Sequence, residues 1–165
     1  MNFKRIANHL LLPDWRVDRA FPQHTLAAIE QAVKASETAH TGEIRFAVEG
    51  ALDGAPLFKG QSARERALDV FSQLRIWDTQ QNNGVLIYLL LADRDVEIIA
   101  DRGAHAKVGS AAWEIICRRM EIAFKDHQYE TGVVSGIHAV TQHLMKHFPA
   151  TDADQNELPN RSVVL

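Results

Sequence analysis

The sequence is poor in cysteine, in long apolar runs and in excess charge of either sign. Cys117 is the only cysteine among 165 residues, which excludes an intrachain disulfide or a cysteine-based zinc cluster and suits a reducing compartment. The longest apolar run, residues 85–92, is far shorter than the ~20 residues that a membrane-spanning helix needs. No secretory leader pattern follows the first basic residues. We therefore expect a cytoplasmic, soluble protein with no direct membrane insertion.

The charge balance is close to neutral. Lys and Arg together number 18 and Asp and Glu 21, for a formal net charge of −3, with 8 histidines besides. Nucleic acids and anionic membrane surfaces preferentially bind basic proteins. We therefore expect no nucleic-acid partner. Hydrophobic residues make up 46% of the chain, which is enough for one packed domain of this length.

Hydrophobic spacing divides the chain into three parts. Apolar residues recur at helical spacing before Pro13, and Pro22 restarts the chain, so residues 1–22 are predicted to be an N-terminal helical extension. Residues 23–149 form the domain, with further helices over 23–40 and up to Phe148. The polar, aperiodic residues 150–165 are expected to be a disordered tail.

The middle of the domain carries strand patterns. Residues 43–49 alternate between apolar and polar side chains, and a loop over 50–60 separates them from a helix that opens with a capping box at Ser62 and Glu65. Residues 85–91 have no polar alternation and predict a strand covered on both faces, which a tight turn at Asp93-Arg94 joins to a strand over 96–100. The predicted fold class is α/β, a three-layer α/β/α sandwich with a small mixed sheet that contains a β-hairpin and has room for a short fourth strand at its edge.

Three familiar chemical signals are weak. Asp93 and Asp95 superficially match a phosphatase nucleophile motif, but a strand follows at once, which favours a hairpin turn. His143 and His147 have the spacing of a zinc-binding pair on a helix but lack a third ligand nearby. Cys117 lies on a predicted core face and favours an inert thiol.

One group of polar residues is predicted to meet at one end of the sheet. Its members precede the central strand or follow its hairpin partner: Asp78, Asn82, Asn83, Asp101, Arg102 and His105. The start of one hairpin strand lies beside the end of the other, so these side chains form a candidate pocket. Oxygen ligands on loops suit calcium or magnesium, whereas ordinary loop capping by Asp and Asn is the alternative interpretation.

The hairpin region resembles the TPM domain, a family also known as DUF477. The matching residues are Asn83-Gly84 and the apolar strand, Asp93-Arg94, Val96-Glu97-Ile98 and Gly103. The resemblance covers residues 42–148 and implies an α/β/α sandwich. Members include a thylakoid acid phosphatase, a photosystem II repair protein and an accessory protein of acetylcholine receptors. This chain is similar to the short cytoplasmic bacterial branch, which implies an unidentified protein partner in a LemA-like or membrane-associated assembly.

The chain departs from the family pattern at its acidic positions. Many members have Asp at the position of Asn82, and a Gly-x-Gly-x-Glu run where this chain has Asp101 in the first position and His105 in the last. The resemblance therefore implies a weakened or remodelled metal site, with Asp78, Asn82, Asp101 and His105 as its candidate ligands for calcium, magnesium or zinc. No cofactor is otherwise indicated.

Two functions follow from these observations. The first is a non-catalytic accessory or interaction module of the TPM type, favoured because no nucleophile and no full ligand set is visible. The alternative is a divalent-metal-dependent phosphatase acting on phosphate monoesters, in which the metal polarises the phosphoryl oxygens and His105 moves the proton.

Overall fold

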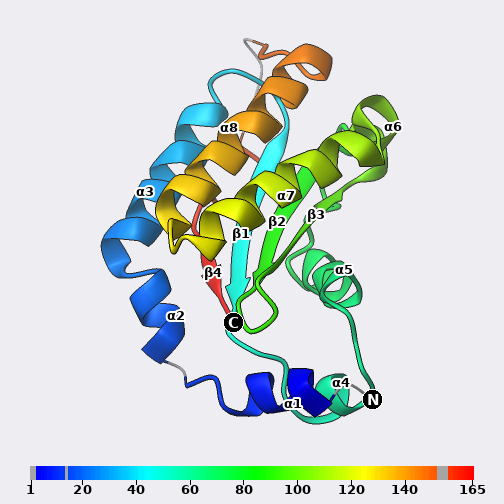
Figure 1. The fold of residues 1–165 in the computed structure, drawn as a ribbon. Helices are drawn as coiled ribbons and strands as arrows, with labels where there is room; N and C mark the ends of the chain where they lie inside the picture. The colour runs from blue at the N-terminus through cyan, green and yellow to red at the C-terminus, as the bar shows by residue number, and fades with distance from the viewer. Residues whose placement is uncertain (1–2, 14, 152–155) are drawn as a thin grey trace.

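The computed structural model describes residues 3–13, 15–151 and 156–165 of the chain (Figure 1). Eight helices and four strands are described in these ranges. In chain order they are α1 (Phe3–Leu10), α2 (Trp15–Ala20), α3 (Gln23–Ser36), β1 (Glu43–Glu49), α4 (Gly54–Phe58), α5 (Ala63–Gln73), β2 (Gly84–Leu90), β3 (Asp95–Ala100), α6 (Arg102–Val108), α7 (Ser110–Lys125), α8 (Tyr129–His147) and β4 (Val163–Val164).

The four strands form one mixed sheet in the order β3-β2-β1-β4. β1 runs parallel to β2, with Glu43 opposite Gly84, and it also runs parallel to β4. β2 and β3 form the predicted antiparallel hairpin, with Leu90 opposite Asp95. The carboxyl ends of β1 and β2 therefore lie at the same edge of the sheet as the β2–β3 turn, and their amino ends lie at the edge where β3 finishes.

Helices cover both faces of this sheet, as the sequence predicts. One face of β1 and β2, which includes Ile44 and Ile87, packs against α3, α7 and α8 in the larger hydrophobic core. The opposite face, which includes Leu86 and Tyr88, packs against α5 in a smaller core. Every residue of β2 is buried, because the strand is covered on both sides. Figure 1 shows the resulting three layers, with α3, α7 and α8 on one side of the sheet and α5 on the other.

Two short helices are absent from the sequence prediction. The predicted loop over 50–60 contains α4, whose Pro56 lies in the first turn, where proline is tolerated, and whose Leu57 is buried in the smaller core. α6 follows β3 directly, because Asp101 acts as its N-cap and Ala104 is fully buried against the larger core. The predicted capping box of α5 is present, with Ser62 and Glu65 each bonded to the other's backbone N–H.

The C-terminal segment corrects the prediction of a disordered tail for residues 156–165. Val163 and Val164 pair with β1 as the fourth strand, and Leu158 is buried in the smaller core. The Glu157 backbone N–H donates to Glu43 Oε1 at 2.7 Å, and Arg45 donates to the Pro159 carbonyl. The segment is ordered because β4 pairs with the edge of β1 that lies opposite β2. Residues 152–155 of the predicted tail lie outside the described residues.

The N-terminal extension is attached to the hairpin turn. Arg5 forms an ion pair with Asp93 at 2.8 Å, and His9 Nε2 lies 3.0 Å from the same carboxylate. The other ring nitrogen of His9 accepts a hydrogen bond from the Leu52 backbone N–H. Among the described residues, no helix combines the length and the apolar character needed to cross a bilayer.

Candidate functional site

The two loops of the predicted pocket do meet at the amino-terminal edge of β1 and β2. The Asp101 backbone N–H donates to the Gly84 carbonyl at 2.8 Å, and the Ala104 N–H donates to the Asn82 carbonyl at 3.1 Å. Gly103 makes this approach possible, because a Cβ there would lie 2.6 Å from the carbonyl oxygens of Gln81 and Asn82. The loop before β2 therefore packs directly on the first turn of α6.

Three of the predicted side chains come together there. Asp101 Oδ1 accepts from the Arg102 backbone N–H at 2.8 Å and so caps α6. The Arg102 guanidinium donates in turn to Asn82 Oδ1 at 3.3 Å. Asn82 has a φ of 51°, in the left-handed region that asparagine tolerates better than most residues. This cluster joins the two loops through hydrogen bonds within the protein.

Asn83 also bonds within the fold. Its side chain is fully buried and donates to the Thr41 carbonyl at 2.8 Å, while its backbone N–H donates to Thr79 Oγ1 at 3.1 Å. These bonds join the loop before β2 to the residues that precede β1. They explain why a residue with a short side-chain donor stands before the central strand.

Asp78 and His105 point to other neighbours. Asp78 is exposed and forms an ion pair with Arg75 at 3.3 Å. His105 lines a cavity of about 550 Å³ between β3 and α7, together with Asp95 and Cys117. In the parts of the chain that the structure describes, no three His, Cys, Asp or Glu side chains are grouped closely enough to hold a metal ion. The four predicted metal ligands are thus not brought together as one set.

The weaker chemical signals have structural roles. Asp93 binds Arg5 and His9 in the hairpin turn, and burial raises the pKa of Asp95 to about 6, with Glu97 adding to the effect. Burial raises the pKa of the Cys117 thiol to about 12, which keeps it protonated and unreactive at neutral pH. The His143 ring packs edge-on against Trp113, and burial lowers its pKa.

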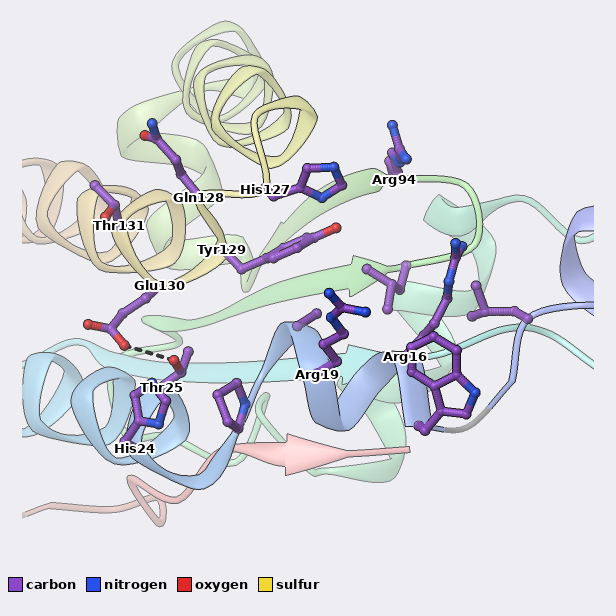
Figure 2. A pocket seen from close by; sticks show the side chains of 15 residues that line it. Arg16, Arg19, His24, Thr25, Arg94, His127, Gln128, Tyr129, Glu130 and Thr131 are labelled. Atoms are coloured by element: carbon purple, nitrogen blue, oxygen red, sulfur yellow. Dashed lines mark hydrogen bonds between the residues drawn. The ribbon is translucent and has the colours of Figure 1, made fainter.

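A larger cavity, which was not predicted from the sequence, lies at the opposite edge of the sheet. It has a volume of about 870 Å³ and sits beside the carboxyl ends of β1 and β2, where open α/β sheets commonly bind ligands. We name it the carboxyl-edge cleft. Figure 2 shows the side chains that line it, most of which come from α2, the start of α3, the β2–β3 turn, the loop between α7 and α8 and the start of α8.

The polar lining of this cleft is mainly basic. Arg16 and Arg19 extend from α2 and Arg94 from the β2–β3 turn, and each of these arginines is exposed. Among the described lining residues, Glu130 is the one carboxylate, and it accepts a hydrogen bond from Thr25 Oγ1 at 2.8 Å. The sequence signal for the cleft was too dispersed to recognise, because its arginines lie on elements far apart in the chain.

Aromatic packing fixes one wall of the cleft. The Tyr129 ring stacks on Phe124 at 5.3 Å between ring centroids and packs against Phe21 at 5.4 Å. Its hydroxyl points into the space between His127 and Arg19 (Figure 2). This packing holds the Tyr129 ring in place, and the Tyr129 hydroxyl faces the basic side chains.

Comparison with known proteins agrees with the resemblance noted in the sequence. The model of the TPM domain matches residues 18–143. Among solved structures, the BA42 protein of the psychrophilic bacterium Bizionia argentinensis is 30% identical, with a TM-score of 0.76 over 86% of this chain and 93% of that one. The N-terminal domain of a P. gingivalis protein has the same fold at 21% identity, with a TM-score of 0.61 over 78% of this chain and 81% of that one. No curated protein matches the chain.

Proposed function

The chain belongs to the TPM domain family, and on that premise we propose that it is a non-catalytic accessory module that binds a partner. One observation supports this proposal above the others. The polar side chains at the amino-terminal edge bond to the protein itself, since Asp101 caps α6 and Asn83 joins the loop before β2 to the start of β1. Groups that a hydrolytic site would present to its substrate are here used to hold two loops together.

Exposed apolar side chains support the interaction role. Phe3, Leu10 and Leu11 recur at helical spacing along α1 and directly after it, and they are 74%, 60% and 78% exposed. Large apolar side chains grouped on a surface are typical of protein contacts. We propose that the partner belongs to a LemA-like or membrane-associated assembly, in keeping with the family resemblance. We also propose a cytoplasmic location, which the free, buried Cys117 supports.

Hydrolysis of a generic aryl phosphate tests the non-catalytic proposal. We expect the purified full-length protein to give no turnover above a buffer blank with magnesium, calcium or zinc. Turnover that depends on one of these ions and is lost in Asp101→Ala would overturn the proposal. A folded Asp101→Asn variant, which keeps an oxygen acceptor for the cap of α6, separates loss of a ligand charge from loss of the helix.

A second candidate function is a divalent-cation-dependent phosphatase, and one atom favours it. Asp101 Oδ2 is buried and has no hydrogen-bond partner within the described residues, and the loop that contains Asn82 packs against the same turn of α6. These two side chains fit two oxygen ligands of a hard cation, and water would complete the shell. A bound cation would supply Lewis-acid polarisation of a phosphate ester there.

Thermal unfolding decides whether a cation binds at Asp101. In the phosphatase case, a cation at a hundredfold excess over its dissociation constant stabilises the native state by ~2.7 kcal/mol, and Asp101→Ala removes that shift. In the accessory-module case, calcium, magnesium and zinc leave the unfolding temperature of the wild type unchanged. A shift that survives Asp101→Ala would point to the His143–His147 pair.

A further inference from the structure

Among the described residues, the basic side chains of the carboxyl-edge cleft have no acidic partner. Within the described residues, Arg16, Arg19 and Arg94 form no ion pair and donate no side-chain hydrogen bond, although they line one cavity. The carboxylate of Glu130 already accepts from Thr25. Three guanidinium groups around one space repel each other, and an anionic ligand would relieve that repulsion.

Two helix N-termini add to the positive potential of the cleft. α3 begins at Gln23 and α8 at Tyr129, and the first turns of both helices line the cavity. Neither N-cap residue, Pro22 or Gln128, provides a side-chain acceptor for the backbone N–H groups of the first turn. These groups and the helix dipoles favour an anion at the same place as the arginines.

The backbone at Arg94 points to a role for its side chain. Arg94 has a φ of 54°, and His127 on the facing loop has a φ of 59°. Glycine adopts this left-handed conformation without the steric cost that other residues bear. An arginine at this turn position is therefore unfavourable for the backbone, and its side chain is among those that line the cleft.

We propose that the carboxyl-edge cleft binds a phosphate-bearing small molecule. The planar guanidinium fork matches phosphate oxygens in pairs, and arginines on two walls allow more than one oxygen to be contacted at once. The volume of about 870 Å³ is larger than phosphate requires and falls in the range of small-molecule sites, so the ligand has an organic part as well. Trp15 and the Tyr129 ring provide surface for that part.

This inference goes beyond the accessory-module proposal and does not depend on it. The cleft and the Asp101 cluster lie at opposite edges of the sheet, so binding at one can be measured separately from hydrolysis at the other. If the inference is wrong, phosphate compounds do not bind specifically in the cleft. If the proposed function is wrong, the protein shows metal-dependent turnover of an aryl phosphate.

The test is titration of the full-length protein with pyrophosphate and with ADP, followed by amide NMR shifts. We expect saturable shifts at residues 24–25, 94 and 127–131 and none at 101–105, with ADP binding more tightly than pyrophosphate. Arg19→Ala and Arg94→Gly each weaken binding at least tenfold. Arg118→Ala is the matched control, because Arg118 is an exposed arginine paired with Glu114 on α7, and this variant keeps the wild-type affinity.

Thermal unfolding of the same variants separates binding from folding. Arg94→Gly keeps or raises the unfolding temperature, because glycine relieves the left-handed backbone, while it loses ligand affinity. The inference is overturned if sodium chloride at the same ionic strength reproduces the shifts, if both cleft variants bind as tightly as the wild type, or if the shifts occur at 101–105 instead.

Discussion

At the scale of single residues, the smaller core contains a buried charge network. The Tyr88 hydroxyl donates to Glu49 Oε2 at 2.6 Å, and Arg66 donates to both oxygens of the same carboxylate at 2.8 and 3.0 Å. Glu49 is buried, and the Arg66 side chain is only 19% exposed. Two partners therefore satisfy a carboxylate that has lost most of its water.

Removing one partner of this network is predicted to be costly. Arg66→Ala leaves the Glu49 carboxylate buried and unpaired, and we expect it to lower the free energy of unfolding by about 3 kcal/mol in urea titrations. Arg64→Ala is the control on the same helix, because Arg64 pairs with Glu97 at a more exposed position and its loss costs under ~1 kcal/mol. Equal effects of the two substitutions would contradict this account.

Glu43 makes stability depend on pH. Burial raises the pKa of Glu43 to about 7, against the opposing hydrogen bond from the Glu157 N–H, and Glu37 adds to the rise. The native state therefore holds this proton more tightly than the unfolded chain does. The stability that Glu43 contributes is fully present below its ordinary pKa of 4.5 and is lost as pH rises through about 7.

Glu43→Gln isolates this effect. Glutamine keeps an oxygen acceptor for the Glu157 N–H but cannot ionise, so we expect the variant to match the wild type near pH 4.5 and to exceed its stability by about 3 kcal/mol at pH 8. Denaturant titrations at the two pH values measure the difference. The pKa of Asp95 is also raised, but Asp95 is present in both proteins, so its contribution to the pH dependence of stability cancels in the comparison. A constant difference across this range would mean that Glu43 titrates normally.

At the scale of elements, the C-terminal segment completes the sheet. β4 supplies only two paired residues, yet Leu158 is buried and the side chains of Glu37 and Glu30 accept hydrogen bonds from Asn160 and the Ser162 N–H. The segment is polar and aperiodic because its contacts are mainly backbone and side-chain hydrogen bonds. Composition therefore predicted disorder where specific pairing with β1 produces order.

Leu158 tests whether this segment stabilises the domain. Leu158→Ala removes a side chain that is 8% exposed and is expected to lower the free energy of unfolding by about 2 kcal/mol. Val164→Ala, at a position in β4 that is 48% exposed, should change it by less than ~0.5 kcal/mol. Both values come from chemical denaturation, and a neutral Leu158→Ala would show that the segment is not docked in solution.

The other elements show which helices and strands a local sequence pattern can predict. The alternation over 43–49, the continuous apolar run of β2 and the capping box of α5 are properties of neighbouring residues, and each predicted its element correctly. α4 and α6 are too short for a periodic pattern and depend on one buried contact each, at Leu57 and Ala104. Such contacts exist only after the sheet has formed.

At the scale of the whole molecule, the sheet separates two cores. Ile44 on β1 faces the larger core and Ile99 on β3 faces the smaller one, with β2 between their strands. Ile44→Val and Ile99→Val are each expected to cost about 1 kcal/mol, and the double variant should lose the sum within ~0.5 kcal/mol. The measurement is a double-mutant cycle by denaturant unfolding. A larger coupling would mean that packing strain passes through the sheet.

The sequence by itself determined the fold class, the hairpin and the meeting of two polar loops at the amino-terminal edge, because these follow from local periodicity and from the geometry of a hairpin. The family was recognised by resemblance to the TPM domain at particular residues, such as Asn83-Gly84 and Asp93-Arg94. Tertiary structure alone decided what those polar side chains do, since bonds such as that of Asn83 to Thr41 join segments far apart in the chain. The tertiary structure also forms the carboxyl-edge cleft. Arg16 and Arg94 face one cavity only because strand order brings α2 beside the β2–β3 turn, and no local pattern encodes that proximity.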